Sequence, residues 1–142
     1  ATAFGATDVV DASAADPVAA VRDLTGGRGA DVLLDAVGGA RTFATAVAMR
    51  APGSRLVVVG APKTGEIAEL GLRELFLTGG SIRVSIWGDC TASRDLPLLA
   101  ARYLDGVLPL DRYLSGTFAL DEAQEGYDRL LAGEGLRGVV VL

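Results

Sequence analysis

The chain has 142 residues, half of them hydrophobic and 22% charged, which is typical of one globular domain rather than of a disordered chain. Its net charge of −5, with basic residues scattered singly, argues against a nucleic-acid partner. One cysteine and no histidine exclude an internal disulfide, a zinc site built from this chain alone, and any catalytic pair that needs histidine.

The first elements along the chain alternate between β-prone runs and a helix. Asp8–Asp11 is a short β-prone run. A helix is predicted to begin at Pro17, with Asp16 as its N-cap. The nearly continuous apolar run Ala30–Val37 predicts a strand that is covered on both faces, as in parallel sheets.

The same alternation continues through the middle of the chain. Arg41–Arg50 is predicted to be a helix, and the apolar run Arg55–Val59 a second buried strand. Leu70–Leu77 is ambiguous between a short helix and a loop, whereas Ser81–Trp87 alternates and predicts a strand. No run approaches the roughly 20 apolar residues of a membrane span, and we expect a cytoplasmic protein.

Two helices and a strand are predicted in the last third. Ser93 is expected to cap a helix that Gly106 terminates. Asp121 and Gln124 fit a capping box for a further helix. Leu136–Leu142 then predicts a final strand.

This order of strands and helices predicts an α/β fold with a doubly wound, Rossmann-type parallel sheet and helices on both faces. Ligands of such sheets bind at the carboxyl ends of the strands. Two of these ends carry glycines, at Gly38-Gly39 and Gly60. Glycine there either lets a flat ligand approach the backbone or simply makes a turn, and the residues alone leave both interpretations open.

Four segments resemble the zinc-type medium-chain alcohol dehydrogenases, which depend on NAD(P). The segments are GGRGADVLLDAVGG, RLVVVGAP, SIWGD and DEAQEGYDRLLAGEGLRGVVVL, in this order, so that the resemblance covers essentially the whole chain. The stretch WGDCTASRDLP is most similar to the branch that oxidises thiol adducts of formaldehyde, notably the mycothiol-dependent formaldehyde dehydrogenases.

The resemblance implies that three strand ends and one arginine contact the cofactor. The first strand end would lie against the adenosine side, the second would hold the nicotinamide carboxamide, and the third would lie beside the nicotinamide ring. The arginine would pair with the pyrophosphate, which a guanidinium can bind in bidentate fashion. These residues are Ala36, Val37, Gly38, Val59, Gly60, Ala61, Ser85, Ile86, Trp87 and Arg137.

Alternatives remain for two of these residues and for the other polar groups. Trp87 could belong to the core, and Arg137 could be a solvent-facing strand residue. Asp35 is interpreted as a buried acid with backbone partners, and Cys90 as a structural or incidental thiol. No catalytic residue and no metal ligand is predicted within the chain.

The family's Gly-x-Gly-x-x-Gly fingerprint, its ribose-binding acid and its catalytic domain have no counterpart here. We therefore expect a sheet without its first two strands, with Asp8–Asp11 unpaired or paired out of order. Residues 1–108 would be a truncated nucleotide-binding domain, and residues 109–142 a segment returning to the catalytic domain. The chain alone would be inactive.

The resemblance implies an oxidoreductase that transfers a hydride from an alcohol or a thiol hemiacetal to NAD or NADP, with zinc as Lewis acid in the missing half. Its partners would be the cofactor, a small alcohol or aldehyde, and further copies in a dimer or tetramer. Glu66–Leu70 and Ser81–Ile86 are expected at the dimer interface. The alternatives are a zinc-free NADPH-dependent quinone or enoyl reductase of the same superfamily, and a non-catalytic remnant or binding module.

Overall fold

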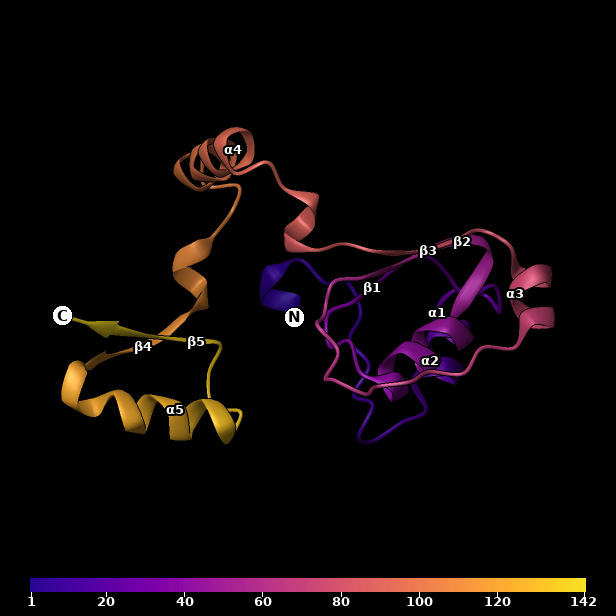
Figure 1. Ribbon diagram of the computed structural model, residues 1–142, viewed down its shortest axis with the longest axis horizontal. Coiled ribbons are helices and arrows are strands. Elements are labelled where there is room, and N and C mark those ends of the chain that lie inside the picture. Colours follow the sequence, from indigo (N-terminus) through magenta and orange to yellow (C-terminus); the bar gives the residue numbers. More distant parts are fainter. The chain divides into compact units, whose positions relative to one another are not determined.

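The computed structural model describes residues 1–142 and separates into two compact units, residues 1–89 and 90–142 (Figure 1). Each unit contains its own parallel sheet, with three strands in the first and two in the second. The α/β class and the parallel arrangement predicted from the sequence are therefore confirmed. None of the helices has the length and apolar character needed to cross a membrane.

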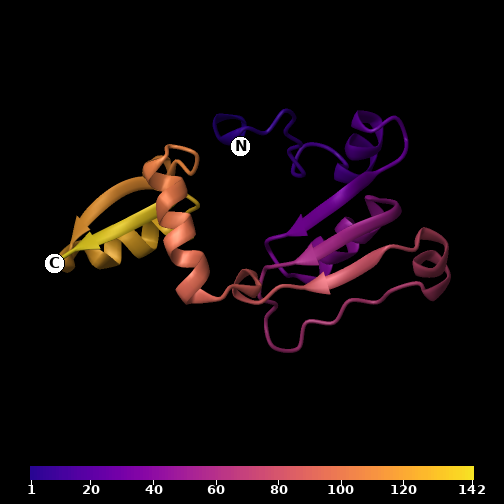
Figure 2. The ribbon, with the colours of Figure 1, turned by 90° about the horizontal axis from the view of Figure 1, so that it is seen from above.

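The first sheet has the order β1-β2-β3, in which β1 is Ala30–Asp35, β2 is Arg50–Val58 and β3 is Ser81–Val84. The strands are paired so that Leu33 faces Leu56, which faces Ile82. Figure 2 shows the three strands side by side and pointing the same way. Their carboxyl ends therefore meet at one edge of the sheet, where a parallel sheet binds its ligands.

Three α-helices accompany this sheet: α1 (Pro17–Leu24), α2 (Ala40–Ala48) and α3 (Leu72–Thr78). Short 3₁₀ turns lie at Thr2–Phe4 and Trp87–Asp89. Asp16 is the N-cap of α1, as predicted, because its carboxylate accepts the amide of Val18 at 2.9 Å. Leu72–Thr78 is the helix that the sequence left ambiguous.

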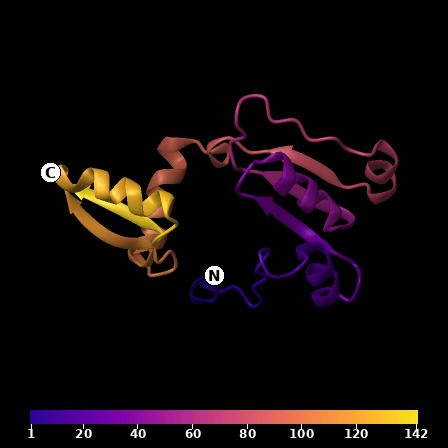
Figure 3. The same cartoon turned by 90° about the horizontal axis from the view of Figure 1, so that it is seen from below.

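The helices α1 and α2 lie on the same face of the sheet. Leu33 and the fully buried Leu56 form the core on that face together with α2, which Figure 3 shows in front of the strands. The helix α1 packs on α2, and Arg22 donates to the carbonyl of Ala48 at 3.1 Å. On the opposite face Val32 and Leu34 are 62% and 69% exposed.

The prediction of helices on both faces is therefore wrong for α1 and α2, which share one face (Figure 1). The three strands follow one another across the sheet in sequence order. Right-handed crossovers that advance in one direction place every connecting helix on the same side.

The β-prone segment Asp8–Asp11 does not form a strand, and the expectation that it is unpaired is confirmed. The carboxylate of Asp11 accepts the amide and the hydroxyl of Ser13 at 2.9 and 2.6 Å. These local bonds, which lower the pKa of Asp11, favour a turn over an extended chain.

The second unit contains α4 (Ala92–Leu104), β4 (Leu114–Ala119), α5 (Ala123–Leu131) and β5 (Arg137–Val141), with 3₁₀ turns at Leu110–Tyr113 and Leu120–Glu122. The strands β4 and β5 are parallel neighbours, and α5 packs along one face of the pair (Figures 2 and 3). The strand β4 was not predicted from the sequence, because Ser115 and Gly116 interrupt its apolar pattern.

Two predicted helix caps in this unit are wrong. The N-cap of α4 is Thr91 instead of Ser93, and the carboxylate of Asp95 accepts the amide of Thr91 at 2.8 Å. Before α5, Glu122 accepts the amide of Ala119 at 2.9 Å, in place of a capping box at Asp121. The first compact unit ends at residue 89, so α4 belongs to the second unit. The boundary predicted at residue 108 concerns function, and that division into a nucleotide-binding domain and a returning segment stays a prediction.

Candidate functional site

The turns that follow β1 and β2 are joined through one residue, Asp35. Its carboxylate oxygen Oδ1 accepts the amides of Val37 and Gly38 at 3.0 and 3.1 Å. Its main-chain carbonyl accepts the amides of Val59 and Gly60, both at 2.9 Å. Asp35 is 6% exposed, so the interpretation of a buried acid with backbone partners is confirmed.

The two turns also touch each other directly. Gly38 has a φ of +74°, and a β-carbon built on it would overlap the backbone of Gly60. A β-carbon on Gly60 would in turn overlap the backbone of Val37 and Gly38. Contact between the turns therefore accounts for both glycines, whether or not a ligand approaches them.

A cavity of about 200 Å³ lies on the α2 side of this edge. Its lining includes Asp35 and Phe43, together with Glu66 from the loop after β2. Glu66 accepts the amide of Ala40 at 2.9 Å and so caps α2, which places a negative charge where the helix dipole favours one. With two carboxylates in its wall, the cavity is unsuited to a phosphate group.

The end of β3 presents Trp87 to solvent. The amide of Ser85 donates to the carbonyl of Val58 at 2.9 Å, which holds the end of β3 against β2. Beyond it Trp87 is 92% exposed, so it is not a core residue in this structure. Trp87, Gly88 and Asp89 all have positive φ, an unusual conformation for a bulky side chain. The turn therefore holds the indole away from the sheet.

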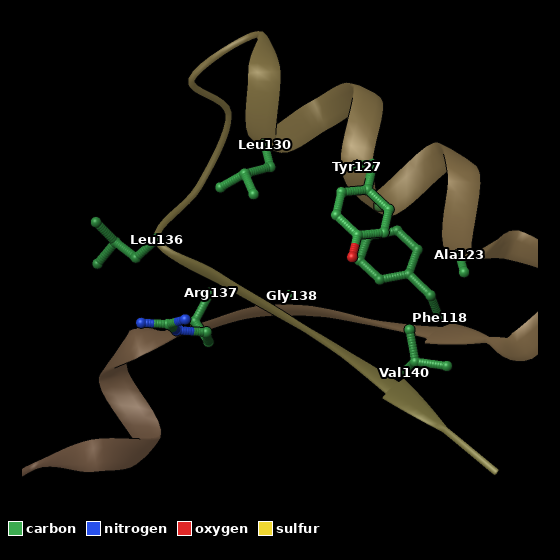
Figure 4. A pocket seen from close by; sticks show the side chains of 9 residues that line it. Phe118, Ala123, Tyr127, Leu130, Leu136, Arg137, Gly138 and Val140 are labelled. Carbon is green, nitrogen blue, oxygen red and sulfur yellow. The ribbon is translucent and has the colours of Figure 1, made fainter. Parts of the chain in front are cut away.

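Arg137 belongs to the second unit, where it begins β5. Its main-chain amide donates to the hydroxyl of Ser115 at 3.0 Å, which attaches the start of β5 to β4. The side chain is exposed and forms no ion pair within the chain. It lines an apolar pocket of about 220 Å³ between α5 and the strands. Figure 4 shows the side chains of Phe118 and Tyr127 in the same lining. The guanidinium is therefore available to an anion.

The remaining polar groups lack the arrangement of a catalytic centre. Asp89 lies 3.8 Å from Arg83, and Arg94 forms an ion pair with Asp95 at 2.6 Å. Partial desolvation, and then the charge of Asp95, raise the pKa of the Cys90 thiol, which disfavours the reactive thiolate. No group of three or more His, Cys, Asp or Glu side chains could hold a metal ion, so these residues do not fit zinc.

The structure thus brings together two of the three predicted strand ends through Asp35, and joins the third to β2 through Ser85. Sequence reasoning interpreted Asp35 correctly but missed that it links two turns. It also missed Glu66, whose partner is 26 residues away and leaves no local pattern.

A model of the family described as zinc-binding dehydrogenase matches residues 1–104. The chain is 33% identical over 141 residues to putative alcohol dehydrogenase D of Mycobacterium tuberculosis (strain ATCC 25618 / H37Rv), covering 97% of this chain and 38% of the relative. It is 28% identical over 115 residues to the S-(hydroxymethyl)glutathione dehydrogenase of Paracoccus denitrificans, covering 80% of this chain and 30% of that relative.

Among solved structures, the benzyl alcohol dehydrogenase from Acinetobacter calcoaceticus superposes with a TM-score of 0.91 and 27% identity. The match covers 98% of this chain and 38% of that structure. The chain therefore spans a little over a third of the length of these two alcohol dehydrogenases.

Proposed function

The chain belongs to the zinc-binding dehydrogenase family, and we propose that it forms one wall of the cofactor cleft in an NAD(P)-dependent alcohol dehydrogenase. One observation carries the proposal: the carboxyl ends of β1 and β2 meet as a single edge, built on Asp35 and the Gly38–Gly60 contact. An edge of this kind is where doubly wound sheets bind dinucleotides.

The proposed contacts follow the three strand ends. Residues 36–38 would lie against the adenosine side of the cofactor, and residues 59–61 against the nicotinamide carboxamide. Residues 85–87 would line the nicotinamide ring, with the exposed indole of Trp87 available to it. Arg137, which has no acidic partner in the chain, would pair with the pyrophosphate.

The proposed reaction moves a hydride from an alcohol or thiol-hemiacetal carbon to the nicotinamide. In such an enzyme zinc polarises the substrate oxygen as a Lewis acid. Since no residues of this chain fit that ion, the chain would contribute cofactor binding and orientation only. Residues 1–108 would act as the nucleotide-binding part, and residues 109–142 as a segment that packs against a catalytic domain.

For the substrate we favour a thiol adduct of formaldehyde or a small alcohol. The first rests on the segment WGDCTASRDLP and on the similarity to an S-(hydroxymethyl)glutathione dehydrogenase. The second rests on the similarity to a benzyl alcohol dehydrogenase. We further propose a cytoplasmic dimer or tetramer in which Glu66–Leu70 and Ser81–Ile86 lie at the interface, because β3 ends the first sheet and offers a free edge.

Titration with NAD and NADP tests the cofactor proposal. In the whole enzyme, Arg137→Ala should raise the dissociation constant of the cofactor about tenfold or more, the equivalent of one lost charge-assisted hydrogen bond. Arg102→Ala on α4 is the control and should leave it unchanged. Equal effects of the two variants would count against a pyrophosphate role for Arg137.

The 142-residue chain by itself is expected to bind either cofactor only weakly. Its fluorescence can report this, because Trp87 is the only tryptophan and is exposed at the proposed nicotinamide side. A cofactor-dependent change that saturates in the low micromolar range would contradict this expectation. Such a result would also favour the alternative of a self-contained binding module.

A further inference from the structure

Asp35 places a carboxylate on the buried face of the first sheet. It is the last residue of β1 and lies on the same buried face as Leu33. Only one of its carboxylate oxygens has partners; Oδ2 is buried and accepts no hydrogen bond from the chain. A buried acceptor without a donor lowers stability. The reason for a carboxylate here must therefore lie in what its other oxygen and its main chain bind.

The bonds made by Asp35 all converge on the two turns. Through Oδ1 it binds two consecutive amides of the turn after β1, and through its carbonyl it binds two consecutive amides of the turn after β2. The side-chain bonds form an Asx turn, which fixes the direction in which the chain leaves β1. Removal of the carboxylate would leave the amide of the buried Gly38 without its acceptor.

The contact between Gly38 and Gly60 transmits this constraint to the second turn. Because neither residue has room for a β-carbon, a shift of one backbone must displace the other. Residues 36–38 and 59–61 are therefore held together by this contact and by the hydrogen bonds that Asp35 makes to both turns.

We propose that Asp35 is a positioning residue for the nicotinamide cofactor: it holds the adenosine-side and carboxamide-side turns in a fixed relation without touching the cofactor itself. The inference rests on the proposed function, because the two turns need a fixed placement only if they form a wall of the cofactor site. Since Asp35 acts through backbone geometry, its loss should weaken cofactor binding and leave the pH profile of kcat unchanged.

The test compares Asp35→Asn, Asp35→Ser and Asp35→Ala in the whole enzyme. Asn keeps an oxygen that can accept both amides, Ser keeps a hydroxyl that reaches only one, and Ala keeps neither. The matched control is Asp31→Asn on the same strand, where the aspartate is exposed and pairs with Arg28. Two readouts are measured: the dissociation constant of the cofactor, and hydrogen exchange of the amides of Val59 and Gly60 relative to residues 43–49.

The dissociation constant should rise about tenfold for Asp35→Ala and less for Asp35→Ser, and it should stay within about twofold for Asp35→Asn and Asp31→Asn. Exchange at Val59 and Gly60 should quicken in the same order, while residues 43–49 stay protected. If Asp35→Ala does not fold, the proposal is tested by the Asn and Ser variants alone: Asp35→Ser should bind the cofactor more weakly than Asp35→Asn and exchange faster at Val59 and Gly60.

Three results would overturn the proposal. In the first, Asp35→Asn binds cofactor as poorly as the Ser or Ala variant. In the second, exchange at Val59 and Gly60 is unchanged in the Ser and Ala variants. In the third, the pH profile of kcat shifts, which would give Asp35 a direct chemical role. If the unaltered enzyme binds neither NAD nor NADP, the proposed function fails instead, and the exchange measurement still tests the coupling of the two turns.

Discussion

The α-carbon of Gly38 lies against the carbonyl group of Gly60, so that neither residue can carry a side chain. The contact joins the ends of two neighbouring strands, β1 and β2. Gly53 provides a natural comparison, because it has the same φ of +74° but open space around its α-carbon.

We expect Gly53→Ala to lower the unfolding free energy by only about 1–2 kcal/mol, which is the cost of a left-handed conformation for a residue with a β-carbon. Gly38→Ala should lower it by about 3 kcal/mol or more, because the new β-carbon must also displace the neighbouring turn. Urea unfolding of both variants measures the difference, and equal losses would show that the two turns can separate freely.

Arg50 should not tolerate lysine. Its guanidinium is buried, donates to the hydroxyl of Ser54 at 3.0 Å, and also donates to the carbonyl of Gly79 at the end of α3. Lysine cannot reproduce this planar set of donors and would bury a strongly hydrated charge. Arg50→Lys should lower stability by about 2–3 kcal/mol, whereas Arg55→Lys, at an exposed position of the same strand, should be neutral. If Arg50→Lys left the stability unchanged, the carbonyl of Gly79 would have to accept a hydrogen bond from another donor.

The start of α4 should weaken in acid because of Asp95. The hydrogen bond from Arg94 and the amide of Thr91 lower the pKa of Asp95. A lowered pKa in the folded state stabilises the protein above the unfolded pKa of about 4, and this contribution disappears as the pH falls through the folded value. The protection of the Thr91 amide against hydrogen exchange, measured relative to the intrinsic exchange rate at each pH, should therefore fall below about pH 4. In Asp95→Asn this protection should be lower already at neutral pH and should change little with acid.

The chain should bind no stoichiometric zinc. It has no histidine and a single cysteine, and its carboxylates are not grouped in threes. Metal analysis after dialysis against zinc should read far below one ion per chain, with Cys90→Ser indistinguishable from the unaltered protein. One tightly held ion per chain would require a ligand set that this fold does not show, for instance one shared between copies.

Local patterns in the sequence were enough to predict several elements. Asp16 with Pro17 marked the start of α1, and the apolar run from Ala30 identified β1 as a strand of a parallel sheet. These predictions succeeded because a cap or a buried strand depends on residues adjacent in the chain. The β-prone run at Asp8 forms no strand for the converse reason, since a strand needs a partner and this segment has none.

For the candidate site, the sequence by itself determined the family, the glycines that end the strands, and the absence of histidine that excludes a zinc site within this chain. Only the tertiary structure decided that Asp35 links two turns, that Glu66 caps α2, and that α1 and α2 lie on one face of the sheet. The physical reason is distance along the chain. A hydrogen bond between residues about 25 positions apart, or the side to which a crossover turns, is set by how the strands pair and leaves no periodic trace in the residues themselves.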